Sequence, residues 1–278
     1  MKRLLSIELQ KIWMNKASRI LTLTYFILLC FIALVAAVKF EIGNFTFQPS
    51  EMGIFNFPFI WHFNTYVAVF FKLFLAIVIV SMMANEYTYG TLKQNLIDGL
   101  SKKEFVISKF LTVLIFAACS TIFVFIITLI LGLCYSSYTE FGIIFSDLGY
   151  LLAFFVNLLG FFSFCLFIGI LVKRSAFALG FLLIWFCLEI FIKWFLASQV
   201  FPDSDKDLLF TQFLPLESIS NLLIEPFTRL SLIQNMGSKI GIESTKDYSV
   251  SYFTILIVLT WTLIFISSSY KLLKNRDL

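Results

Sequence analysis

The stretch VISKFLTVLIFAACSTIFVFIITLILGLCY occupies residues 106–135 and decides the fold class of this chain. Apart from Lys109 it carries no charged side chain. A helix rises about 1.5 Å per residue, so about 20 residues cross the roughly 30 Å hydrocarbon core of a bilayer. Lipid offers the backbone no hydrogen-bond partner, and the alternating pattern of a membrane barrel strand is absent. The stretch therefore predicts a membrane-spanning α-helix.

Five further apolar runs accompany it, and each is long enough to span a bilayer. The six expected spans cover residues 19–38, 59–84, 106–135, 148–172, 176–197 and 250–270. Composition agrees, because 60% of the residues are hydrophobic, 14% are charged and the mean hydropathy is +0.93. Soluble domains carry about 25% charged residues. We therefore expect an all-α integral membrane protein in which residues 1–278 form a single transmembrane domain.

The distribution of charge predicts the orientation in the membrane. Most of the 21 lysines and arginines lie in the N-terminal segment, after the second span, in the turn at 173–175 and in the C-terminal tail. Acidic residues concentrate in the other three connections. Because cytoplasmic connections are enriched in Lys and Arg, both termini are expected to face the cytoplasm. The location that follows is the cell membrane (inner or plasma membrane), crossed several times.

The N-terminal residues 1–17 have a helical pattern of their own. Leu5, Leu9, Ile12 and Trp13 share one face, and the charged residues lie off it. This pattern is typical of a helix that lies in the membrane interface before the chain turns into the first span. The alternative is a plain positively charged flank of that span.

The connection at 201–249 is too apolar for a simple polar linker. Within it, residues 215–225 begin with a proline, carry an acidic residue in the first turn and end before Pro226. These are favoured features at the ends of a helix. We expect a short external helix that rests on the outer leaflet or dips into it.

The connection at 86–105 reads EYTYGTLKQNLIDGLSKKEF. Gly90 and Thr91 read as a break followed by an N-cap, and residues 92–97 as a short helix closed by Gly99. The expected product is a short helix that lies across the cytoplasmic ends of two spans.

A second cap follows in the same connection. Ser101 with Glu104 three residues later predicts a capping box at the start of the next helix. The exposed polar groups of the connection are expected to be Lys93, Gln94, Asn95, Lys102 and Lys103. The alternative interpretation is a well-capped cytoplasmic turn whose lysines only follow the charge distribution of the membrane.

The run EYTYGTLK, continued by GLSKKEF and a further lysine, resembles the segment after the second span of ABC-2 type transporter permeases. In that family the segment forms a coupling helix that docks onto a separate ATP-binding subunit. The positions that match the family pattern are Glu86, Gly90, Thr91, Leu92, Lys93, Ser101 and Lys109. The chain departs from it at residues 98–100, where many relatives have a proline with a small residue.

The resemblance implies a permease subunit that forms half of the translocation path of an ATP-driven exporter. It implies two copies of an ABC ATP-binding subunit and a second permease chain, as a homodimer or heterodimer, in membrane lipid. ATP and Mg would be bound by the ATPase, so we expect no cofactor, no metal and no enzymatic activity here; the chain lacks the GxxxxGK[ST] phosphate-binding motif. The residues expected to couple to the ATPase are Glu86, Gly90, Thr91, Leu92, Lys93, Gln94, Ser101 and Lys102.

Three charged residues, Lys72, Glu189 and Lys193, interrupt apolar spans, where a charge needs a partner or water. Lys72 lies about 21 Å of helix before the inner end of its span. Glu189 lies about 21 Å of helix after the start of its own span, which is also on the inner side. We therefore expect Lys72 and Glu189 at matching depth, paired or sharing one polar cavity that lines the translocation path. The alternative is a pair between Glu189 and Lys193, which are four residues apart on one helix.

Two other functions stay open from sequence. One is a non-transporting assembly or sensory component built on the same scaffold. The other is an ATP-independent secondary transporter or channel, although no internal repeat and no Gly- or Pro-broken span is present in the sequence. Basic residues follow the membrane edge, so no nucleic acid partner is expected. The small number of charges within the spans favours an apolar or amphipathic substrate.

Overall fold

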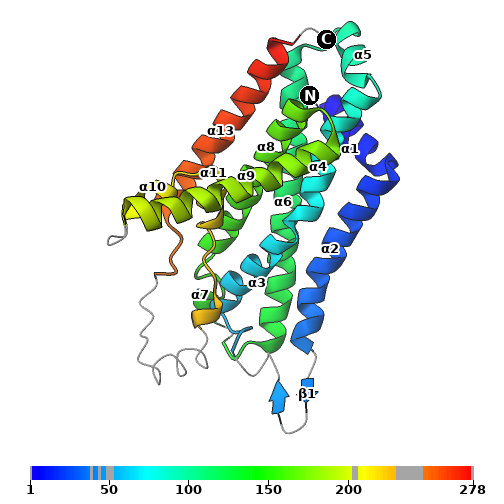
Figure 1. The fold of residues 1–278 in the computed structure, drawn as a ribbon. Coiled ribbons are helices and arrows are strands. Elements are labelled where there is room, and N and C mark those ends of the chain that lie inside the picture. The colour runs from blue at the N-terminus through cyan, green and yellow to red at the C-terminus, as the bar shows by residue number, and fades with distance from the viewer. Residues whose placement is uncertain are drawn as a thin grey trace.

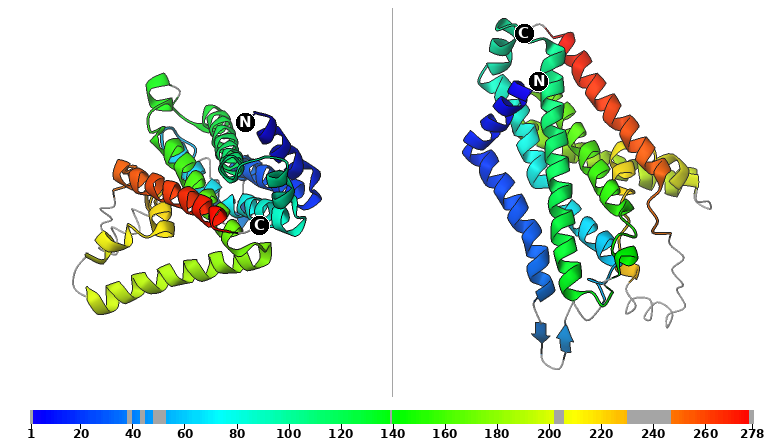
Figure 2. Two further views of the ribbon diagram at one scale, coloured as in Figure 1. Left: turned by 90° about the horizontal axis from the view of Figure 1, so that it is seen from above. Right: turned by 180° about the vertical axis from the view of Figure 1, so that it is seen from behind.

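The computed structural model describes residues 2–37, 40–42, 45–47, 53–138, 140–201, 206–229 and 247–276. The described chain forms a bundle of long helices (Figure 1). The helices α2 (Lys16–Ala37), α6 (Lys102–Tyr135), α8 (Gly149–Val172) and α13 (Tyr252–Lys274) form its length. Both chain termini lie at one end, here called the terminal end, and the strands β1 (Phe40–Ile42) and β2 (Phe45–Phe47) lie at the opposite, hairpin end (Figures 1 and 2).

Length and composition make this bundle a multi-pass membrane protein. Four helical stretches are each long and apolar enough to cross a bilayer, namely Lys102–Tyr135, Phe141–Val172, Ser175–Val200 and Tyr252–Lys274. Two more spans arise if each of two bent helix pairs counts as one: α1 (Lys2–Met14) with α2, and α3 (Phe59–Phe70) with α4 (Lys72–Thr88). The helical fold is thus confirmed, with four to six spans, while the count of six stays a prediction.

The short hairpin between α2 and α3 departs from the all-α expectation. Its strands pair antiparallel, with Phe40 opposite Phe47 and Ile42 opposite Phe45. The hairpin was not predicted, because its strands have only three residues each and carry no signal as strong as a membrane-spanning run.

The N-terminal segment is a helix, as expected, and it makes a sharp angle with the first long helix. The axes of α1 and α2 differ by 90°. At the corner, Asn15 Oδ1 accepts hydrogen bonds from the backbone N–H groups of Ala17 (3.0 Å) and Ser18 (3.3 Å). This side chain therefore caps the start of α2, where the first N–H groups of a helix have no partner within it.

The span expected at 59–84 is not one straight helix. It breaks at Phe71, and α3 and α4 meet at 44°. At the break the N–H of Phe71 bonds to the carbonyl of Ala68 (3.2 Å), and the N–H of Phe74 bonds to the carbonyl of Phe71 (3.1 Å). These bonds span three residues instead of four, so the helix tightens locally and changes direction.

Helix α8 is the central element, buried over most of its length and packed against α3, α4, α6, α9 and α13. Gly160 allows one of these approaches, because a Cβ there would lie 2.6 Å from Val258 Cγ1 of α13. Its buried position agrees with a sequence that is apolar on almost all sides, in contrast to helices that face water on one side.

Helix α9 (Ser175–Phe195) crosses the bundle obliquely and does not run alongside the other long helices (Figures 1 and 2). It packs against α4 and α8 and continues into a π-helical turn, η1 (Leu196–Val200). Most of its large apolar side chains are exposed, Phe177, Leu183 and Phe191 among them. An apolar face of this size is suited to lipid or to a partner chain.

The connection between α9 and α13 enters the bundle. It contains α10 (Lys206–Thr211), α11 (Pro215–Ser220) and the 3₁₀ turn η2 (Phe227–Arg229); residues 202–205 and 230–246 of the expected external loop lie outside the described residues. The helix expected at 215–225 ends at Ser220, yet the chain beyond it is still buried at Leu222 and Leu223.

A side-chain contact fixes the depth of α11. Asn157 Nδ2 donates to the carbonyl of Ile219 (2.6 Å), and Ile219 is buried. Asn157 lies eight residues after the start of α8, about 12 Å along its axis. Helix α11 therefore lies beside α8, within the bundle, and its place relative to the outer leaflet stays a prediction.

Candidate functional site

Helix α5 (Thr91–Ile97) forms where the sequence predicts it, at the terminal end of the bundle (Figure 1). Gly90 enters it in the left-handed conformation with φ 67°, which glycine adopts without steric cost. Gly99 leaves it with φ 97°. One detail of the prediction is wrong: Gly90, and not Thr91, is the N-cap, because the Thr91 hydroxyl points to Glu86 and donates to its Oε2 (2.5 Å).

The capping box at the start of α6 is confirmed. Ser101 Oγ accepts from the backbone N–H of Glu104 (3.2 Å), and Glu104 Oε2 accepts from the backbone N–H of Ser101 (3.0 Å). Two N–H groups at the helix start are thereby satisfied. Ser101 is thus a structural residue of the connection.

Four charged side chains from three helices meet beside α5. Glu8 and Lys11 come from α1, Glu86 from the last turn of α4, and Lys109 from α6; we call them the four-charge cluster. Lys109 Nζ lies 2.5 Å from Glu8 Oε2 and 2.6 Å from Glu86 Oε1. Lys11 Nζ lies 2.9 Å from Glu86 Oε1 and 3.5 Å from Glu8 Oε1. Two cations thus balance two anions, and each cation contacts both carboxylates.

The cluster is buried. Lys109 is 0% exposed, Glu86 3% and Glu8 5%, and only Lys11 reaches the surface. Partial burial alone would lower the pKa of Lys11, but Glu86 and Glu8 outweigh it and raise that pKa above its usual value. Charges removed from water are tolerated when they are paired and hydrogen-bonded. The ion pairs therefore fix α1, α4 and α6 relative to one another at this end.

Helical periodicity explains why Lys109 is inside. It lies four residues after Phe105 and four before Val113, and both are on the buried face of α6. Glu8 and Lys11, by contrast, were expected among the polar residues at the surface of an interfacial helix, and their part in the cluster was missed. A buried lysine in α6 that needs a carboxylate was the one signal that could have pointed to Glu8.

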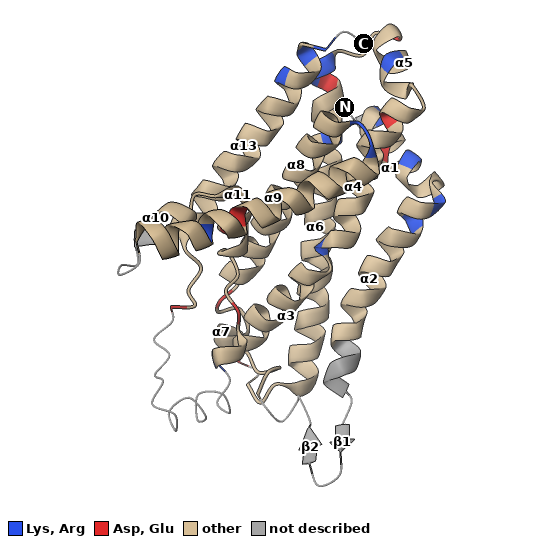
Figure 3. Cartoon of the chain, in the orientation of Figure 1, with Lys and Arg blue, Asp and Glu red and all other residues tan. Residues whose placement is uncertain are grey.

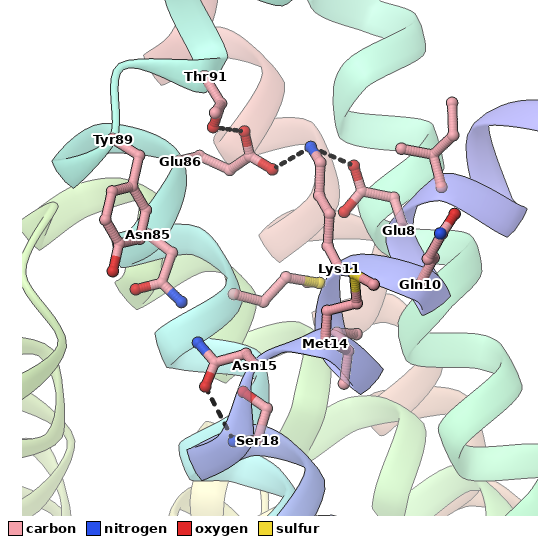
Figure 4. A pocket seen from close by; sticks show the side chains of 13 residues that line it. Glu8, Gln10, Lys11, Met14, Asn15, Ser18, Asn85, Glu86, Tyr89 and Thr91 are labelled. Carbon is pink, nitrogen blue, oxygen red and sulfur yellow. Dashed lines mark hydrogen bonds and ion pairs between the residues drawn. The ribbon is translucent and has the colours of Figure 1, made fainter.

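A cavity of about 470 Å³ opens next to the cluster, between α1, the end of α4 and the start of α5. Figure 4 shows Glu86 reaching from α4 to the Lys11 ammonium on one side and to the Thr91 hydroxyl on the other. The lining residues include Met14, Asn85 and Tyr89. The cluster therefore forms one edge of a hollow between the N-terminal helix and α5.

The outer face of α5 is exposed while its inner face is anchored. Leu92 is 2% exposed and packs into the core, whereas Lys93 and Gln94 are exposed. Two large apolar side chains accompany them, Tyr89 at 73% and Ile97 at 76% exposed. Exposed aromatic side chains such as Tyr89 are a feature that protein interfaces share.

The C-terminal segment bonds to the same end of the bundle. Lys102 Nζ donates to the carbonyls of Lys274 (3.2 Å) and Arg276 (2.9 Å). The Arg276 guanidinium donates to the carbonyls of Ile170 (2.5 Å) and Leu171 (2.9 Å). Lys102, expected at the coupling surface, thus connects the start of α6 to the end of α13.

The expected pairing of Lys72 with Glu189 is wrong, as is the alternative pair of Glu189 with Lys193. Lys72 Nζ donates to Asn157 Oδ1 (2.9 Å), and Lys193 pairs with Glu217 (2.7 Å). Glu189 instead accepts hydrogen bonds from three N–H groups, which belong to the Trp185 indole (2.7 Å), the Leu216 backbone (3.1 Å) and the Glu217 backbone (2.9 Å).

The physical reason for this correction is α11. Its first N–H groups need an acceptor, and the Glu189 carboxylate supplies one, which a helix N-terminus favours. Equal depth along two helices did not predict this, because the competing partner belongs to the connection after α9, which was expected outside the bundle and instead enters it.

Groups of His, Cys, Asp and Glu able to hold a metal ion are absent from the described part of the chain. No curated protein matches the chain. A sequence model of the ABC-2 family transporter proteins matches residues 4–189, which include most of α1, all of α2 to α8 with the four-charge cluster, and the greater part of α9. Members of this family are membrane subunits that normally work with an ATP-binding subunit. The chain therefore belongs to the ABC-2 type transporter permeases and is a component of a membrane transport system.

Proposed function

We propose that the chain is the permease subunit of an ABC exporter and forms half of its translocation path. It crosses the membrane six times, with the α1–α2 and α3–α4 pairs each contributing one span. The terminal end faces the cytoplasm, which agrees with the positively charged residues gathered there in Figure 3. Two ATP-binding subunits and a second permease chain complete the exporter in the cell membrane.

The observation that carries this proposal is the exposed face of α5 above a buried ion-pair cluster. Tyr89, Lys93 and Ile97 form a surface that a partner can contact. Directly behind it, Thr91 bonds to Glu86, which is bonded in turn to Lys109. A force applied to α5 therefore reaches α4, α6 and α1 together through short, charge-assisted contacts.

The residues expected to couple the chain to the ATPase divide into three groups by position. Lys93 and Gln94 contact the partner, because they are exposed. Gly90, Leu92 and Ser101 shape and anchor the helix, and Glu86, Thr91 and Lys102 connect it to the rest of the bundle.

ATP and Mg belong to the partner in this scheme. Closure of two ATP-bound subunits moves α5, and α4 carries the motion to its bend at Phe71. The bend is a place where α3 can change its angle to α4, because the backbone hydrogen bonds there already join residues that are three apart and not four. The path would thus open and close at the level of Lys72.

The test is co-purification of the full chain from its own membranes with its ATP-binding subunit, read out by mass spectrometry and by ATPase activity. Lys93→Glu and Ile97→Asp reverse or add charge on the exposed face of α5 and should lower recovery of the ATPase at least about tenfold. Lys271→Glu, an exposed lysine on α13 at the same end, is the matched control and should retain it. Undiminished recovery with both α5 variants would exclude this face as the docking site.

A further inference from the structure

A second cavity, of about 500 Å³, lies halfway along the bundle between the α3–α4 bend, α8, α9 and α11. Its volume is within the range of small-molecule sites. The walls are mainly aromatic and aliphatic and include Tyr66, Phe70, Phe161, Leu183, Phe186 and Leu223. The cavity is separate from the four-charge cluster and the α5 surface, which lie at the terminal end.

A single cation lies in this apolar wall. Lys72 is the first residue of α4, and its Nζ lies 2.9 Å from Asn157 Oδ1 and 4.4 Å from the centroid of the Phe161 ring. Asn157 is itself fixed, because its Nδ2 donates to the carbonyl of Ile219. The ammonium therefore has a defined position, set by a neutral amide and an aromatic face.

Within the described residues, no carboxylate forms an ion pair with Lys72. The acidic residues of the neighbouring elements have other partners, since Glu189 caps α11 and Glu217 pairs with Lys193. A cation in such surroundings is costly unless an anion joins it.

The rim of the cavity indicates where such an anion comes from. Phe70, Leu73, Leu183 and Phe186 are all exposed at the surface of the chain, between the α3–α4 bend and α9. In a membrane-spanning protein this apolar rim faces hydrocarbon and not water. A ligand that enters here therefore brings an apolar tail as well as a charge.

We propose that this cavity binds an amphipathic molecule with an anionic head group, a carboxylate or a phosphate, and an acyl chain. The head group pairs with Lys72 and accepts a hydrogen bond from its ammonium, while the chain lies along Phe70, Leu183 and Phe186. This deepens the proposed function, because it names the substrate class of the path at Lys72. Binding itself needs neither an ATPase nor transport.

The experiment measures binding to the purified full chain in an uncharged maltoside detergent. The reporter is the fluorescent fatty acid cis-parinaric acid, displaced by dodecanoate, dodecyl phosphate or dodecanol. We expect the two anions to displace it at least about tenfold better than dodecanol, the loss expected for one buried charge-assisted contact. Inorganic phosphate, which has the charge without the chain, should not displace it at the same concentrations.

The variants test whether the charge of Lys72, and not a general change in the protein, causes the preference for anions. Lys72→Gln should remove the preference for anions over dodecanol, Lys72→Arg should restore it, and Lys271→Gln on the far end of α13 should leave it unchanged. If Lys72→Gln does not fold, as judged by size-exclusion chromatography, Leu183→Trp narrows the mouth of the cavity while keeping the lysine. That variant should weaken binding of both anions.

Four results would overturn the proposal. The first three are equal displacement by dodecanol, an anion preference that survives Lys72→Gln, and displacement by inorganic phosphate alone. The fourth combines two observations: the dimeric fraction does not bind the reporter, and Lys72→Gln shifts the oligomeric state. Together they would mean that a second copy of the chain covers the cavity. Failure of the ATPase to co-purify would count against the proposed exporter and would leave these binding results unaffected.

Discussion

Glu86 accepts hydrogen bonds from three separate segments, through Lys11 of α1, Thr91 of α5 and Lys109 of α6. A buried carboxylate is stable only while such partners are present. Glu8 shares Lys109 with it, so the two carboxylates depend on the same ammonium group. The balance of two cations against two anions is therefore the property of this cluster that a substitution can disturb.

Charge balance gives the first prediction. Lys109→Met leaves two buried carboxylates with only Lys11, which is partly in solvent, and should lower the free energy of unfolding by at least about 3 kcal/mol. Adding Glu8→Gln removes one of the unpaired anions and should recover part of that loss. Thermal unfolding of the purified chain in detergent measures both.

The outcome that contradicts this interpretation is simple additivity. If Glu8→Gln in the Lys109→Met background costs as much as it does in the wild-type chain, the two residues are not coupled. Lys16→Met, at an exposed position at the start of α2, is the control for removing one positive charge from the same end.

At the scale of single residues, the sequence predicted which charged residues matter better than it predicted what they contact. Glu86 and Lys109 both stand in the motif that resembles the family, and both are in the cluster. Glu8 was out of reach, because one acidic residue in a short amphipathic helix is ordinarily at the surface. Lys72 was correctly singled out as a costly charge, but its partner is the neutral Asn157, which no charge pattern identifies.

Among the elements, the start of α11 is held by one side chain of α9. The Glu189 carboxylate accepts from the N–H groups of Leu216 and Glu217 at the start of the helix and from the Trp185 indole on its own helix. Lys193 adds an ion pair to Glu217. Together these contacts fasten a six-residue helix, too short to be stable alone, against α9.

The second prediction follows from this cap. Glu189→Ala should lower the free energy of unfolding by about 1–2 kcal/mol and speed hydrogen exchange in residues 215–220, because two backbone donors lose their acceptor. Glu189→Gln keeps one acceptor oxygen and should lose less. If exchange in that segment is the same in Glu189→Ala as in the wild type, the carboxylate does not position α11.

The third prediction concerns the entry to α5. Gly90 has φ 67°, and a Cβ there would meet no atom within 4 Å, so Gly90→Ala changes only the backbone preference. A left-handed alanine costs about 1 kcal/mol, and hydrogen exchange in residues 91–97 should speed up accordingly. Gly142, which lies in the short helix α7 (Phe141–Ile144), also has free space around its Cβ position but has no positive φ.

Gly142→Ala is therefore the matched control for that experiment. It should be neutral or slightly stabilising, because alanine is favoured over glycine inside a helix. Equal effects of the two substitutions would mean that the left-handed conformation of Gly90 does not shape α5.

Element boundaries were predictable where apolar runs end in charged or capping residues. The start of α6 at Lys102, directly after its capping box, is an example. The bend at Phe71 was not predictable, since neither proline nor glycine marks it. Helix α11 ends at Ser220, whereas the sequence predicted its end at residue 225. The prediction was too late because Leu222 and Leu223 continue the apolar pattern in a non-helical segment that is buried against the bundle.

At the scale of the whole molecule, α9 decides how many times the chain crosses the membrane. It runs obliquely across the bundle in Figures 1 and 2, yet its length and exposed apolar face suit a span. The end of α13 provides a constraint. Arg276 bonds to the carbonyls of Ile170 and Leu171 at the end of α8, so both helices end on the same side of the membrane.

Because of that constraint, the side of the membrane on which one residue lies is enough to test the fourth prediction. Between the end of α8 and the end of α13 the chain crosses the membrane an even number of times. The two helices also start together, because the Tyr150 hydroxyl donates to the carbonyl of Tyr248 (2.8 Å), so α13 spans the membrane alongside α8 and the return crossing falls to α9. We therefore expect Ser249, exposed just before α13, on the hairpin side; if neither α9 nor α13 crossed the membrane, Ser249 would lie on the terminal side.

Labelling with a membrane-impermeable maleimide in intact cells distinguishes the two cases, in a background whose five cysteines are replaced. With six spans, Ser249→Cys is labelled from outside together with Ser137→Cys, which follows α6. Lys93→Cys and Lys271→Cys are labelled only after the membrane is permeabilised. If Ser249→Cys follows Lys271→Cys instead, neither α9 nor α13 crosses the membrane, which would contradict both the six-span arrangement and the contact between Tyr150 and Tyr248.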